Sequence, residues 1–69
     1  MGVIIVREMV GTSALGWSDA APQAVAVAGK TVRNIRSVDV VGSTAQVEGG
    51  ETVEYWVQLK LSFEYEGEA

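Results

Sequence analysis

The fold is decided by residues 51–65, which read ETVEYWVQLKLSFEY. Apolar side chains occupy every second position from Val53 to Tyr65, and mostly polar side chains stand between them. A period of two residues is typical of a β-strand with one buried face. Only Trp56 interrupts the polar face. Residues 51–65 are therefore predicted to form a long strand that carries one aromatic ring on its more polar side.

Gly49-Gly50 precedes this strand and can take the positive φ angles of a two-residue hairpin turn. Residues 37–48 are predicted to form the other strand of the hairpin. In that strand Val38 and Val40 lie at even positions and point to one face of the sheet. The apolar residues beyond Gly42 lie at odd positions, so they point to the other face. Either a bulge at Gly42 or a strand that leaves its own sheet to pack on a neighbouring subunit explains the change. We favour the second explanation, because so small a chain needs subunit contacts.

The N-terminal half is predicted to contain a strand over residues 3–10, a turn at Gly11-Thr12-Ser13 and a helix over residues 17–35. Spacings of three and four residues define the apolar face of this helix. Its members are Ala21, Ala24, Val25, Ala28, Val32 and Ile35. We expect Lys30, Arg33 and Arg36 to lie near its negative end, and Gly29 to mark the close approach of another backbone.

A strand, a helix and a hairpin predict a single α+β domain over residues 1–69. The simplest closure is a three-stranded antiparallel sheet wrapped on one helix, with the third strand between the other two. One helix covers one face of the sheet, so the other face is expected to stay open.

The size of the chain predicts association with other copies. A domain of 69 residues hides only about 60% of the surface that its unfolded chain exposes. The sequence has neither cysteine nor histidine, so it lacks the usual means of building disulfides or a structural zinc site. Its residues are nevertheless 48% hydrophobic. We expect part of this apolar surface to meet other subunits in a homo-oligomer.

Charge and composition argue against several classes of function. The net charge of −4, with five Lys and Arg residues, disfavours nucleic acid and anionic membranes as partners. The apolar run Val3-Ile4-Ile5-Val6 is too short for a membrane span, and we expect a cytoplasmic protein. Without histidine or cysteine, the common nucleophilic and general-base mechanisms lack their usual groups. The sequence therefore predicts a protein that is not an enzyme.

Two features could bind something. Trp56, which we expect beside the start of the second strand, can stack on a flat ligand or be buried at a subunit interface, and the second role is the more common one. Acidic residues gather at the hairpin and at the tail, where they supply oxygen ligands for a cation or simply remain solvated. They are Glu48, Glu51 and Glu54, and Glu64, Glu66 and Glu68.

The order of elements and several short motifs resemble those of the dodecin family, over nearly the whole chain. The motifs are Val10-Gly11-Thr12-Ser13, residues 17–21, Asn34-Ile35-Arg36, Asp39-Val40-Val41 and residues 55–63. The resemblance implies a hollow shell of twelve copies that binds or stores a small ligand. It also implies that the change of parity at Gly42 is a strand crossing between subunits.

Flavin-binding dodecins carry a stacking tryptophan near the start of strand two and a glutamine on strand three, and the matching positions here are Ser37 and Trp56. The candidate ligand-binding residues are thus Trp56, Ser37 and Gln58. The chain also resembles, at Gly16-Trp17 and residues 34–36, a branch that lacks the stacking tryptophan and is associated with calcium. The resemblance assigns no metal ligands. Flavin and calcium are therefore the two ligands that it implies. The alternative function is a calcium- or cation-binding, or purely structural, shell without an organic ligand.

Overall fold

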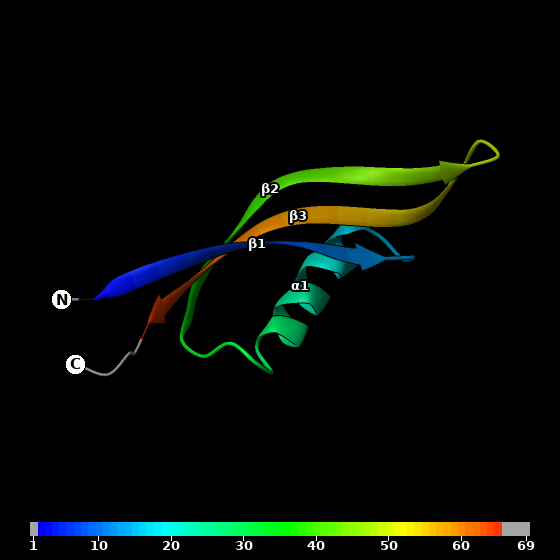
Figure 1. Ribbon diagram of the computed structural model, residues 1–69. Coiled ribbons are helices and arrows are strands. Elements are labelled where there is room, and N and C mark those ends of the chain that lie inside the picture. Colours follow the sequence, from blue (N-terminus) through cyan, green and yellow to red (C-terminus); the bar gives the residue numbers. More distant parts are fainter. Residues whose placement is uncertain (1, 66–69) are drawn as a thin grey trace.

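The long alternating segment forms the central strand of the molecule. The computed structural model describes residues 2–65, in which β3 (Glu51–Tyr65) lies between β1 (Val3–Ser13) and β2 (Ile35–Glu48), all antiparallel (Figure 1). Helix α1 (Trp17–Ala28) follows β1 and packs on one face of the sheet. The predicted α+β order and the central position of the third strand are confirmed.

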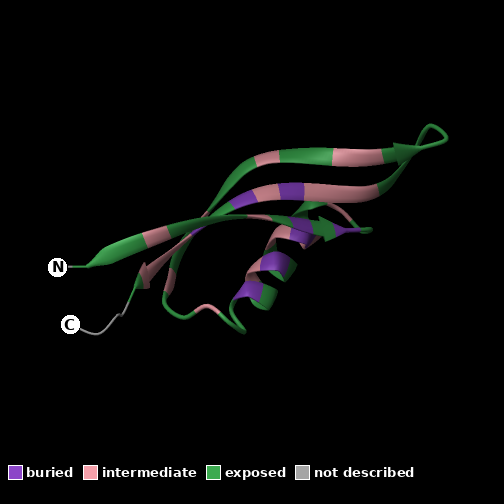
Figure 2. Ribbon diagram, in the orientation of Figure 1, coloured by how far each residue is buried: buried purple, intermediate pink, exposed green. Residues whose placement is uncertain are grey.

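The two faces of the sheet differ as the alternation predicts. The helix-side face carries the β3 residues Tyr55, Val57, Leu59, Leu61 and Phe63. The open face carries Glu54, Trp56, Gln58, Lys60 and Ser62. The core is small and joins Val57 and Leu59 to Ala20 and Ala24 of the helix (Figure 2).

The hairpin turn is the predicted one. Gly49 and Gly50 have φ angles of 58° and 79°, a combination that favours glycine at both positions, and Glu48 pairs with Glu51 across the turn. The change of parity in β2 is a bulge, because the register shifts between Val40 and Gly42 while the strand stays paired with β3. The favoured explanation, a strand leaving its own sheet for another subunit, is therefore wrong for this segment.

The helix is shorter than the predicted span of residues 17–35. It ends at Ala28, where Gly29 caps it, and Asn34 with a φ of 61° turns the chain into β2. Its buried face is Ala20, Ala24 and Ala28, so Val32 and Ile35 are not part of it. Lys30, Arg33 and Arg36 lie beyond the helix, and its last turn contains no basic residue. Gly29, with its low helix propensity, and the β-branched residues after it favour an early end.

The close backbone approach occurs at Gly11 and not at Gly29. A Cβ atom on Gly11 would lie 2.7 Å from the Ala20 carbonyl oxygen and 2.8 Å from the Ala24 Cβ, whereas one on Gly29 would meet only its own helix. The absence of a side chain lets the strand continue under the helix, so residues 11–13 pair with β3 instead of forming the predicted turn.

Candidate functional site

Trp56 lies on the open face of the sheet, away from the helix. It is half-buried between its cross-strand partners Thr12 on β1 and Thr44 on β2. Its Nε1 donates a hydrogen bond of 2.7 Å to Oε1 of Glu54, two residues earlier on the same face. Because Thr44 belongs to the second half of β2, the expectation that Trp56 stands beside the start of that strand is wrong. The bulge and the hairpin register place it there.

Gln58 is the neighbour of Trp56 along the open face. Its Nε2 donates to Oγ1 of Thr44 at 2.9 Å, so its amide is held toward β2. Gly42 lies opposite, and a Cβ there would come within 2.9 Å of the Gln58 Oε1. An aromatic ring, an amide and a threonine hydroxyl thus lie together on adjacent strands. Such a set can stack on a flat ligand and bond its polar edge.

Ser37 does not join this group within one subunit. It is paired with Ser62, six residues along β3 from Trp56, which corresponds to about 20 Å at about 3.3 Å per residue. Ser37 is exposed and lies on the open face with Ser62. A small ligand that touches both Ser37 and Trp56 must therefore lie between two copies of the chain.

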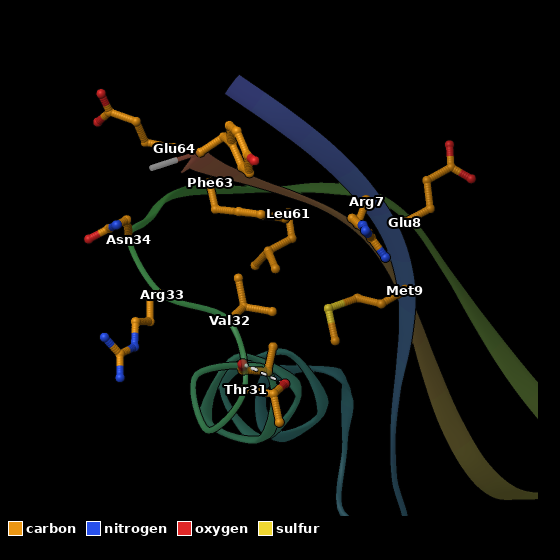
Figure 3. A pocket seen from close by; sticks show the side chains of 12 residues that line it. Arg7, Glu8, Met9, Thr31, Val32, Arg33, Asn34, Leu61, Phe63 and Glu64 are labelled. Atoms are coloured by element: carbon orange, nitrogen blue, oxygen red, sulfur yellow. Dashed lines mark hydrogen bonds between the residues drawn. The ribbon is translucent and has the colours of Figure 1, made fainter. Parts of the chain in front are cut away.

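Two hollows lie near these strands. A cavity of about 270 Å³ on the flank of Gln58 is lined also by Val10, Val41 and Leu59. A larger cavity of about 730 Å³ lies on the helix side, between the end of α1 and the first half of β1 (Figure 3). Of the residues expected from the sequence it contains Glu64, but none of the candidate ligand-binding residues Trp56, Ser37 and Gln58.

Trp17 has a structural role on the other face. Its Nε1 donates to the Thr44 carbonyl oxygen at 3.0 Å, and its ring meets Tyr55 edge to face with the centroids 4.9 Å apart. The first residue of the helix is thereby fixed to both hairpin strands. Thr44 binds Trp17 through its carbonyl and Gln58 through its hydroxyl, a link that the sequence pattern does not single out.

The acidic residues form no metal centre among residues 2–65, where no three carboxylates gather around a common point. Glu54 is hydrogen-bonded to Trp56, and Glu64 forms an ion pair with Arg36 at 3.0 Å. Glu66 and Glu68, which also figured in the expected acidic groups, lie outside the described residues. The one helix in the described chain is too short to cross a membrane.

The chain matches known proteins along nearly its whole length. The family model named Dodecin matches residues 3–66. A calcium dodecin from Mycobacterium tuberculosis is 33% identical over 63 residues, which are 91% of this chain and 89% of that protein.

Solved structures agree with this match. A dodecin from Streptomyces coelicolor is 34% identical with a TM-score of 0.92, over 97% of this chain and 96% of that one. The structure of the calcium dodecin from M. tuberculosis is 30% identical with a TM-score of 0.84, over 97% of this chain and 96% of that one. The identities to the calcium dodecin and to the S. coelicolor dodecin are nearly equal, so identity assigns the chain to no branch of the family. The family model and the shared fold place the chain in the dodecin family.

Proposed function

We propose that the chain assembles into a homododecameric shell that binds and stores a small, flat aromatic ligand on the open faces of its sheets. Dodecins are ligand-binding proteins that catalyse no reaction, and the chain is not an enzyme. The observation that carries the proposal is how little apolar surface one subunit covers. In residues 2–65, twelve large apolar side chains are exposed, whereas the buried ones larger than alanine are Val57, Leu59 and Leu61 (Figure 2).

These exposed side chains are spread over every element of the subunit. Val3, Ile4 and Val6 lie on β1, and Val40 and Val41 lie on β2, with exposed fractions between 53% and 64%. Contacts on several sides of one subunit fit a closed shell better than a simple dimer. A core of this size also stabilises a lone chain poorly, so assembly supplies the missing apolar burial.

The ligand part of the proposal is supported by Trp56 and Gln58. Trp56 presents an aromatic ring on a face that the helix does not cover, and Gln58 offers an amide beside it. Ser37 joins them only from another copy, so the site belongs to the assembly. Both positions that match the flavin site of other dodecins are changed here, and the stacking ring comes from β3 instead of β2.

Native mass spectrometry of the purified protein tests the shell and its content together. Twelve subunits with an added mass the size of a flavin support the proposal, whereas a monomer contradicts it. Flavin mononucleotide is then added as a probe and the loss of its fluorescence is measured. Trp56→Ala is expected to abolish this quenching and to leave assembly intact, while Trp17→Phe, on the other face of the sheet, is the matched control.

A second candidate is a shell that binds calcium. It is favoured by the 33% identity to the calcium dodecin and by the net charge of −4. A ligand that binds only the native state raises the melting temperature by mass action. Higher melting temperatures in calcium than in chelator support this candidate, and equal temperatures contradict it.

A further inference from the structure

The end of the hairpin extends beyond the rest of its own subunit. Strand β1 ends at Ser13, opposite Tyr55, so residues 46–54 pair only with one another. We call this segment the hairpin arm (Figure 1). A two-stranded hairpin is at best marginally stable in water, and it needs a third strand or a packed surface to persist. The molecule is 55 Å long and only 19 × 14 Å across, so its own chain offers no such surface to the arm.

The arm is acidic at its turn. Glu48 and Glu51 are directly opposite each other across the turn, an arrangement that is destabilising between like charges. Val53 follows at the register shift between Gln46 and Val47 and is 45% exposed. No Lys or Arg occurs between residues 42 and 59. The arm therefore carries an exposed apolar side chain and two exposed carboxylates that have no basic residue near them on the hairpin.

The cavity of about 730 Å³ at the other end of the subunit has the opposite character. Met9, Val32, Leu61 and Phe63 form an apolar floor, on which Met9, Val32 and Leu61 point toward one another (Figure 3). We call this cavity, with Arg7 and Arg33 on its rim, the basic pocket.

The two arginines of the basic pocket are available for pairing. Two acidic residues also line the pocket. Glu64 already pairs with Arg36, and Glu8, next to Arg7 on β1, points to the opposite face of the sheet. Arg7 and Arg33 are exposed, and neither forms an ion pair within residues 2–65.

We propose that the hairpin arm of one copy docks in the basic pocket of the next copy. Val53 lies on the apolar floor, and Glu48 and Glu51 pair with Arg7 and Arg33. The arm cannot reach the pocket of its own chain, because ten residues of β3 separate Glu51 from Leu61, about 33 Å along the strand.

The contact is therefore head-to-tail. Contacts of this kind join different surfaces of the two partners and close into a ring when the rotation permits. The inference rests on the proposed shell and assigns one of its interfaces.

Charge reversal tests the contact. One variant carries Glu48→Lys and Glu51→Lys, a second carries Arg7→Glu and Arg33→Glu, and a third carries all four changes. Each is analysed by native mass spectrometry and by dilution in the presence of a chelator, with circular dichroism to check the fold. The charge-matched control carries Glu66→Lys and Glu68→Lys, which add the same charge as the arm variant elsewhere in the chain.

We expect the arm and pocket variants each to raise the protein concentration at half-assembly by at least about tenfold, a modest loss for two close charge pairs. The four-fold variant should assemble like the parent, because it restores opposite charges. Assembly of the parent should also weaken between about 0.1 M and about 1 M salt, where the Debye length falls from about 10 Å to about 3 Å.

Three outcomes would overturn the inference while the shell stands. The first is full assembly of both the arm variant and the pocket variant. The second is failure of the four-fold variant to assemble. The third is dissociation of the Glu66→Lys and Glu68→Lys control alone, which would point to the C-terminal residues as the occupant of the pocket. A parent that is monomeric overturns the shell and the docking together.

Discussion

Replacing Gly11 by alanine should lift the helix from the sheet. The new Cβ would stand 2.7 Å from the Ala20 carbonyl oxygen and 2.8 Å from the Ala24 Cβ, whereas ordinary contacts begin at 3.4 Å. The helix backbone must therefore retreat by about 0.7 Å, the difference between these distances. Ala20 and Ala24 pack against Val57 and Leu59, so this displacement opens the middle of the core.

The magnitude follows from two opposing effects. Overpacking a well-packed core costs about 1–3 kcal/mol. Gly→Ala also reduces the entropy of the unfolded chain, which returns about 0.4–1 kcal/mol. A net loss of about 1–2 kcal/mol remains, and for a domain of this size it lowers the melting temperature by roughly 5–15 °C.

Thermal melts followed by circular dichroism measure this loss, at one fixed protein concentration because oligomer stability depends on it. The matched control is Gly29→Ala, which makes the same chemical change where the backbone is helical, with φ of −64°, and where the nearest atoms belong to the same helix. The control should be neutral or stabilising by up to about 1 kcal/mol. A Gly11→Ala protein that melts at or above the parent would refute the close approach of helix and strand.

Three further substitutions probe the same packing. Leu59→Ala removes the largest fully buried side chain and should cost about 2–5 kcal/mol, seen as a lower denaturant midpoint; an unchanged midpoint would show that other copies refill the cavity. Trp17→Phe keeps the edge contact with Tyr55 but removes the hydrogen bond to the Thr44 carbonyl. It should lower the free energy of unfolding, measured by urea titration, by about 0.5–1.5 kcal/mol. An unchanged free energy would show that this hydrogen bond is dispensable. Ser13→Ala removes the hydroxyl that donates to Asp19 Oδ2 at 2.7 Å and accepts from the Leu15 amide. It should lower the free energy of unfolding by about 1–3 kcal/mol in the same assay. An unchanged value would mean that water replaces both hydrogen bonds.

The candidate site could be predicted only in part. Trp56 and Gln58 share a face because strand periodicity puts positions two apart on the same side, and the structure agrees. Their partner Thr44 depends on the register of β2, which the bulge between Val40 and Gly42 shifts. The separation of Ser37 from Trp56 follows from the same register.

The basic pocket had a weaker signal in the sequence. Its lining comes from three distant segments, residues 7–9, 28–34 and 61–65. The only hint is that four of the five basic residues fall at positions 7, 30, 33 and 36, while the hairpin arm has none. Charge counts alone do not tell which segments lie side by side.

Elements with a local cause follow from the amino-acid sequence. The alternation from Val53 to Tyr65 requires a half-buried strand, and Gly49-Gly50 supplies the two positive φ angles of its turn. The tertiary structure alone decided where the helix ends, which alanines it buries and which glycine it presses against. Those features depend on how closely Ala20 and Ala24 approach Gly11, a contact between segments that are separate in the chain. Periodicity records which side of an element is apolar, but only packing decides what that side meets.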